Sequence, residues 1–216
     1  MSEHPPVVAI SSAYGAGGSR VAPEVAELLH LPFVGRLVPA DVATDVGGEA
    51  LEPDEQPEGV FRRLVDALAR MPALLGSTMP LPDQPLSDEQ RLRMVAEEET
   101  CRIATTTGGV ILGRGAAALL RDDPNVCRVR LRGPVEPRIR RAMELEGVDE
   151  ATARHRQLAT DRFRAVWVQR AYGCDVDDPS LYHLVVDTTA CTLGAAAHLV
   201  ADFATACSRD GTRPRT

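Results

Sequence analysis

The residues with the clearest chemical potential form a glycine-rich stretch, SAYGAGGS, at positions 12–19. The stretch follows an apolar run and precedes a segment with helical periodicity. A loop in that place directs several backbone N–H groups and the positive end of a helix dipole at one point, which favours phosphate. The standard phosphate-loop pattern is G-x-x-x-x-G-K-S/T. Here Ser12 replaces the first glycine and Gly18 replaces the lysine.

This stretch allows two interpretations. In the first it binds phosphate: Ser19 keeps the hydroxyl that usually contacts Mg²⁺, and Arg20 supplies charge from a different position. In the second it is a tight strand-to-helix turn without a ligand, because glycines permit such a turn by themselves. The first interpretation predicts these contacts to the phosphates of a nucleotide: Tyr14, Gly15, Ala16, Gly17, Gly18, Ser19 and Arg20.

The cationic chemistry of this chain rests on arginine alone. All 24 basic residues are arginine, and no lysine occurs among the 216 residues. Anion binding must therefore use guanidinium groups, backbone N–H groups or helix dipoles. The net charge of −7 argues against a general nucleic-acid coat, whereas the arginines between residues 128 and 170 suit a small anion.

Several arginines occupy positions from which they could reach a phosphate. Arg114 directly follows an apolar run and stands between two glycines. In the next helical segment, Arg154, Asp161 and Arg164 fall within about 80° of one another at about 100° per residue. A carboxylate between two guanidinium groups could orient them toward phosphate. The alternative is that these charges form ordinary surface ion pairs.

The elements that must position these residues alternate along the chain. Apolar runs predict strands at 7–11, 31–35, 108–113, 126–133 and 181–188. Helical spacing predicts helices at 21–30, 60–70, 87–106, 134–146, 149–171 and 193–207. The uninterrupted run at 108–113 is typical of the middle of a parallel sheet, whereas 126–133 alternates as a strand nearer the edge would. We expect a doubly wound parallel sheet of about five strands, with ligands at the carboxyl ends of the strands.

One domain over residues 1–208 fits this length and pattern. Four prolines between 71 and 89 predict an irregular, mobile connection within an insert at about 40–100, and a disordered tail is expected at 209–216. The composition is 44% hydrophobic, and no apolar stretch reaches the roughly 18 residues of a membrane span. Five widely spaced cysteines indicate reduced thiols. We therefore expect a cytoplasmic protein without a membrane partner.

Four motifs in a fixed order resemble the cytidylate kinase-like family, a branch of the P-loop nucleoside monophosphate kinases. They are S-x-x-Y-G-x-G-G, I-L-G-R-G-A, D-x-x-R and Y-G-x-D-x-x-D-P-S-x-Y-x-L-V-V-D-T, and the similarity covers residues 7–36 and 108–200. The resemblance implies a three-layer P-loop kinase fold with a monophosphate-binding insert and an arginine-bearing helical lid at about 149–175. It also implies transfer of the γ-phosphoryl group of ATP to CMP or dCMP with Mg²⁺.

The resemblance also implies roles for individual residues. Arg114 would bind the acceptor phosphate, Arg154 and Arg164 would bridge the transferred group, and Ser19 would contact Mg²⁺. Arg36 stands where similar proteins have D-R before their monophosphate-binding segment, although Gly35 replaces the acid here. Asp161 would join Arg36 and Arg114 in binding the substrate.

Three functions are compatible with these observations. The first is a kinase acting on small-molecule nucleotides. The second is a regulatory module that binds nucleotide without turnover, which the missing lysine favours because that lysine normally stabilises the transition state. The third is a kinase for a sugar or another small metabolite on the same fold.

Overall fold

The computed structural model describes residues 6–35, 97–98, 100–113 and 115–209. Two predicted substrate residues, Arg36 and Arg114, lie outside the described residues. The same holds for most of the predicted insert, including the proline-rich connection and the predicted helix at 60–70. Of the predicted helix at 87–106, residues 97–98 and 100–106 are described, and they are helical.

Five parallel strands form one sheet, as the sequence predicts. Their order across the sheet is β2-β3-β1-β4-β5, and every neighbouring pair is parallel. The strands are β1 (Val7–Ser12), β2 (Phe33–Val34), β3 (Gly109–Leu112), β4 (Val126–Arg132) and β5 (Leu184–Asp187). The chain continues from β1 to one side of the sheet and later returns to its other side. The carboxyl end of β1 is therefore the point where ligands of such sheets usually bind.

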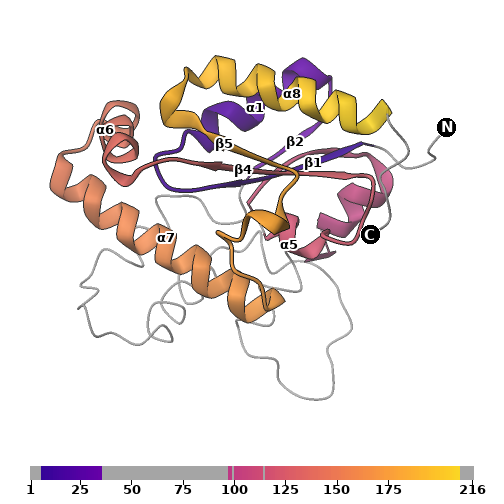
Figure 1. The fold of residues 1–216 in the computed structure, drawn as a ribbon, viewed down its shortest axis with the longest axis horizontal. Helices are drawn as coiled ribbons and strands as arrows, with labels where there is room; N and C mark the ends of the chain where they lie inside the picture. The colour runs from indigo at the N-terminus through magenta and orange to yellow at the C-terminus, as the bar shows by residue number, and fades with distance from the viewer. Residues whose placement is uncertain (1–5, 36–96, 99, 114, 210–216) are drawn as a thin grey trace, which may run out of the picture.

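Helices cover both faces of this sheet (Figure 1). One face carries α1 (Gly18–Leu29) and α8 (Leu193–Arg209), whereas the other carries α5 (Ala116–Leu119) and α7 (Glu150–Tyr172). Because side chains alternate along a strand, β1 contributes to two separate cores. Val8 and Ile10 pack toward α1 and α8, and Val7 and Ala9 pack toward α5 and α7.

Local signals set the ends of the helices near the loop. Helix α1 follows Gly17 and ends at His30, both in the left-handed conformation. Helix α7 begins after Asp149, whose carboxylate accepts a hydrogen bond from the Thr152 amide (2.7 Å), and it ends at Gly173. Helix α6 (Val135–Glu146) precedes it and ends at Gly147. These boundaries agree with the predicted helices to within a few residues.

Four details differ from the sequence-based expectation. Helix α1 begins at Gly18 rather than at residue 21, because the glycine loop leads directly into its first turn. Strand β5 begins only at Leu184, because Pro179–Leu181 forms a 3-10 turn capped by Asp178. The short helix α5 was not predicted, and α8 extends to Arg209, past the predicted end at 207. Within the described ranges, no helix is long and apolar enough to cross a membrane.

Candidate active site at the glycine loop

The glycine loop joins the central strand β1 to the first turn of α1. Gly15 (φ 70°) and Gly17 (φ 77°) adopt the left-handed conformation that other residues rarely reach. A Cβ atom at Gly15 would overlap the carbonyl oxygen of Arg138, and one at Gly17 would overlap the side chain of Leu193. The glycines are therefore required both by the turn and by the close approach of α6 and α8.

Four backbone N–H groups of this loop have no acceptor in the described part of the chain. They belong to Gly15, Gly17, Gly18 and Ser19, and no side chain caps the start of α1. Unpaired N–H groups at a helix start carry a partial positive charge and attract anions. Ser19 and Arg20 are exposed beside them. The loop thus meets the requirement for a phosphate site that the sequence predicts.

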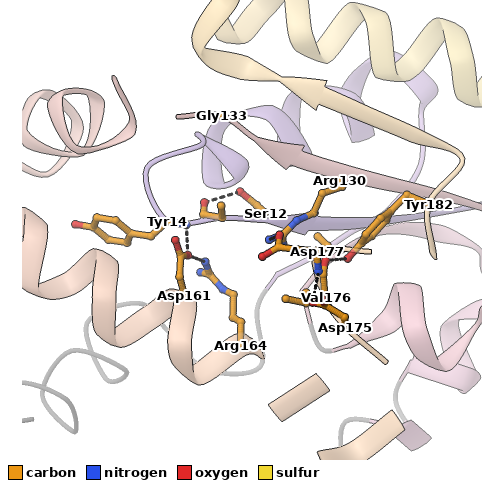
Figure 2. A network of polar contacts seen from close by, with 12 residues as sticks. Ser12, Tyr14, Arg130, Gly133, Asp161, Arg164, Asp175, Val176, Asp177 and Tyr182 are labelled. Atoms are coloured by element: carbon orange, nitrogen blue, oxygen red, sulfur yellow. Dashed lines mark hydrogen bonds and ion pairs between the residues drawn. The ribbon is translucent and has the colours of Figure 1, made fainter. Parts of the chain in front are cut away.

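Asp161 connects helix α7 to the glycine loop (Figure 2). Its Oδ1 atom accepts the Tyr14 amide (2.8 Å) and lies 3.4 Å from Arg164 Nη1. Its Oδ2 atom accepts hydrogen bonds from Arg138 Nη1 (2.9 Å) and Gln157 Nε2 (3.0 Å). Arg138 Nη1 also donates to the Tyr14 carbonyl (2.5 Å). Asp161 and Arg164 therefore come together as predicted, and they do so next to the loop.

These contacts keep Asp161 ionised. Burial of the carboxyl group acts to raise its pKa, but the Tyr14 amide, the Gln157 amide and the charges of Arg138 and Arg164 together outweigh burial. The net result is a pKa below the ordinary value for aspartate. At neutral pH the carboxylate therefore holds both arginines by charge as well as by hydrogen bonds.

Tyr14 and Thr188 fix the loop at two further points. The Tyr14 hydroxyl donates to Glu146 Oε2 (2.8 Å), which also pairs with Arg156 Nη1 (2.8 Å). Burial, followed by the hydrogen bond to Glu146, raises the pKa of Tyr14, so the hydroxyl stays protonated. Thr188 Oγ1 donates to the Ala16 carbonyl (2.9 Å). The Tyr14 amide is already used by Asp161 and the Ala16 amide by the Ala13 carbonyl (3.2 Å), which leaves the amides of Gly15, Gly17, Gly18 and Ser19 for a ligand.

Arg154, which the sequence groups with Asp161 and Arg164, does not contact Asp161. Arg154 Nη2 lies 2.6 Å from Glu136 Oε2 and 2.7 Å from Glu150 Oε1, and these side chains are largely exposed. Instead, Arg138 of α6 is the second arginine on Asp161. Sequence reasoning missed Arg138 because helical spacing within α7 gives no information about a neighbouring helix. The catalytic role of Arg154 stays a prediction.

A second charged group that sequence reasoning missed lies beside the end of β1 (Figure 2). Arg130 of β4 is 4% exposed and stands opposite Ser11 in the sheet. Its Nη1 donates to Ser11 Oγ (2.8 Å), and its Nη2 lies 2.6 Å from Asp177 Oδ1. A buried charge needs such partners. The sequence signal that could have found it is the arginine at every second position of a strand that is otherwise apolar, VCRVRLR.

Among the described residues, no group of three or more histidine, cysteine, aspartate or glutamate side chains could hold a metal ion. Mg²⁺ in phosphate sites commonly uses one or two protein ligands together with substrate phosphates. An exposed Ser19 hydroxyl at the start of α1 fits that arrangement.

The sequence itself identifies the family. The model of the cytidylate kinase-like family matches residues 7–190. This chain belongs to the cytidylate kinase-like family. The resemblance inferred from the four ordered motifs is thereby confirmed, and the matched range contains the glycine loop, the Asp161 contacts and the Arg130 group.

Curated cytidylate kinases match part of this family member. The cytidylate kinase of Aeropyrum pernix is 31% identical over 102 residues, which is 47% of this chain and 59% of that protein. The cytidylate kinase of Methanopyrus kandleri is 29% identical over 108 residues, which is 50% of this chain and 56% of that protein. The chain thus spans less than two thirds of the length of either relative.

Solved structures confirm the fold over almost the whole chain. An uncharacterized protein from Eubacterium ventriosum has a TM-score of 0.64 at 20% identity, with 93% of this chain and 98% of that one covered. A gluconokinase from Sinorhizobium meliloti has a TM-score of 0.53 at 15% identity, with 95% of each chain covered. At these identities the likeness concerns the three-layer kinase fold alone.

Proposed function

We propose that this chain is an ATP-dependent phosphotransferase that phosphorylates CMP or dCMP. One observation carries the proposal: four loop amides that find no acceptor among the described residues lie at the end of the central strand, beside an arginine-bearing helix that is bonded to the same loop. The family membership supports a kinase-like reaction. The choice of cytidylate as acceptor rests on the two similar proteins from Aeropyrum pernix and Methanopyrus kandleri, both of which are cytidylate kinases.

The loop residues fit the phosphates of ATP. The amides of Gly15, Gly17, Gly18 and Ser19 would bind phosphate oxygens, and the Ser19 hydroxyl would contact Mg²⁺. Bound MgATP would supply the transferable γ-phosphoryl group. The glycines let α6, α8 and the end of β1 approach the loop closely, and Thr188 bonds the Ala16 carbonyl of the same loop. The protein thus provides an ordered set of donors before the ligand arrives.

The arginines would stabilise the charge of the transferred group. Phosphoryl transfer demands positioning and neutralisation of the equatorial oxygens more than covalent chemistry. Arg164 is oriented by Asp161, and Asp161 is bonded to the loop. Arg154, Arg114 and Arg36 keep the roles that the family resemblance implies, the last two on the acceptor side.

A coupled assay with ATP, Mg²⁺ and each common nucleoside monophosphate tests this proposal. We expect formation of CDP or dCDP, and we expect Arg164→Ala to lower kcat about a hundredfold to a thousandfold. Arg114→Ala should abolish turnover of the monophosphate. Arg170→Ala, an exposed position near the end of the same helix α7, is the matched control and should retain activity.

A melting experiment with MgATP separates the alternatives. Ligand at a hundredfold excess over Kd stabilises the native state by about 2.7 kcal/mol. A MgATP-dependent rise in Tm without turnover of any monophosphate would replace the kinase proposal with a nucleotide-binding module. Turnover of a sugar in place of CMP would favour the third function, and no rise and no turnover would refute nucleotide binding at this loop.

A further inference from the structure

Gly18 stands at the lysine position of the phosphate-loop pattern, yet its backbone does not require glycine. Gly18 is absent from the residues with positive φ, unlike Gly15 and Gly17. What excludes a side chain there is space. A Cβ atom at Gly18 would lie 2.5 Å from Ser12 Oγ, 2.6 Å from Ser12 Cβ and 3.2 Å from Leu112 Cδ1. The first two separations are too short for real contacts.

Ser12 is the residue that fills this space. It is the last residue of β1, it is 3% exposed, and it stands where the standard pattern has its first glycine. Its hydroxyl donates to the Ala13 carbonyl (3.1 Å) and is therefore held within the loop. The two departures from the standard pattern thus meet in space, although six positions separate them in sequence.

We propose that Ser12 and Gly18 form a compensating pair: the Ser12 side chain closes the lysine position of the loop, and Arg164 of α7 supplies the missing cation. This inference rests on the proposed function, because it concerns the charge on the phosphates of ATP. It explains why a chain with Ser12 needs a glycine at position 18. It also explains why Arg164 is connected to the loop through the Asp161 carboxylate.

Arg164 suits this task better than the other arginines near the loop. Arg138 is 5% exposed, and its guanidinium already donates to Gly133, Tyr14 and Asp161. Arg20 is exposed on α1, beyond the loop. The Arg164 side chain is 19% exposed, and its Nη1 approaches the same Asp161 oxygen that accepts the Tyr14 amide. It therefore combines a fixed position beside the loop with access to a ligand.

The steric half of the proposal is tested by melting temperatures of Gly18→Ala, Ser12→Gly and the double variant. Gly18→Ala alone should lower Tm by about 5 °C or more, because Cβ overpacks a closed space. In the Ser12→Gly background the same change should cost much less, so that the effects are strongly non-additive. Gly194→Ala, in the first turn of α8, is the matched control, because the nearest neighbour that its Cβ would meet, Glu24 Oε1, lies 3.4 Å away.

The cationic half is tested by placing a lysine in the opened space. In the natural chain Arg164→Ala should lower kcat about a hundredfold or more. In Ser12→Gly/Gly18→Lys the same change should lower kcat tenfold or less, because the lysine supplies the charge. If the chain binds MgATP but does not turn over, the MgATP-induced rise in Tm replaces kcat as the readout in both backgrounds.

Three results would overturn the proposal. Additive effects of Ser12→Gly and Gly18→Ala on Tm would show that the two residues do not compete for space. An equal loss on Arg164→Ala in both backgrounds would show that the lysine and the arginine do not replace each other. The same conclusion would follow if Ser12→Gly/Gly18→Lys/Arg164→Ala folded but bound MgATP no better than Arg164→Ala alone. Absence of turnover in every variant would refute the kinase proposal alone, since the melting arms still report.

Discussion

At the scale of single residues, Asp161 connects three parts of the candidate site. It links the loop backbone at Tyr14 to α6 through Arg138 and to α7 through Gln157 and Arg164. Arg138 is nearly buried, so it depends on this carboxylate for charge compensation. Loss of the negative charge should therefore affect both folding and the orientation of Arg164.

Asp161→Asn keeps the shape of the side chain but removes its charge. We expect a loss of about 2–3 kcal/mol in the free energy of unfolding at pH 7, because the buried Arg138 loses its anionic partner. Urea unfolding of the two proteins measures this difference. Asp202→Asn, at an exposed position of α8, is the control and should stay within about 0.5 kcal/mol of the natural chain. An equal, small effect of both changes would contradict the linking role.

The same pair of proteins should differ in its dependence on pH. The pKa of Asp161 is lower in the folded than in the unfolded chain, so its contribution is complete above the unfolded pKa of about 3.9. It is lost as pH falls through the lower folded value. The difference in unfolding free energy between the natural chain and Asp161→Asn should therefore stay constant from pH 7 to about pH 5 and shrink below about pH 4. A difference that grows toward low pH would contradict this assignment.

At the scale of elements, the glycine loop is defined by what packs against it. Gly15 faces the backbone of α6 at Arg138, and Gly17 faces the end of the Leu193 side chain on α8. Gly147 and Gly173 have the same left-handed backbone at the ends of α6 and α7, but a Cβ atom there would meet nothing within 4 Å. These four glycines separate the effect of backbone conformation from that of close packing.

Alanine at each of these glycines should give a ranked series of stabilities. Gly147→Ala and Gly173→Ala should cost about 1–2 kcal/mol for the left-handed backbone alone. Gly17→Ala should cost more, and Gly15→Ala most, because backbone yields less than a flexible leucine. Thermal or urea unfolding of the four variants tests the order. A Gly15→Ala variant as stable as Gly147→Ala would show that α6 moves freely away from the loop.

At the scale of the whole molecule, an acidic chain with a net charge of −7 brings three arginines together at one edge of its sheet. Arg130, Arg138 and Arg164 come from β4, α6 and α7, and they converge beside the end of β1. No lysine side chain occurs in the sequence. Any cationic side chain that binds phosphate in this chain must consequently be an arginine.

Selective modification of the natural protein tests this dependence. A guanidinium-specific dicarbonyl reagent should abolish the MgATP-induced rise in Tm, and MgATP present during modification should protect against the loss. An amine-specific acylating reagent should leave the rise unchanged, because no lysine is available to it. Mass spectrometry identifies the protected arginine, which we expect to be Arg164. Loss of the rise after amine acylation would contradict arginine-based binding.

Several features of the site followed from local pattern. The five strands were predictable because each is a short apolar run bounded by glycine, proline or polar residues. The approach of Asp161 and Arg164 was predictable because residues three positions apart on a helix lie on the same side. The glycine loop was recognisable because its composition and its place between strand and helix are local properties.

Other features depend on contacts between distant parts of the chain. The bond from Arg138 to the Tyr14 carbonyl spans 124 positions, and the bond from Arg130 to Ser11 spans 119. Hydrophobic periodicity indicates which side of an element faces the core, but it does not indicate which residue lies opposite. For that reason the sequence paired Asp161 with Arg154, whereas in the folded chain Arg138 takes that place and Arg154 pairs with Glu136 and Glu150.

The sequence by itself thus determined the layered fold, the family and the position of the glycine loop, because periodicity and short motifs are properties of neighbouring residues. Only the tertiary structure decided which arginines meet the loop and why the loop carries no lysine. The physical reason is that Ser12 and Gly18 compete for one space at the end of β1, and shared space between separate elements exists only once the chain has folded.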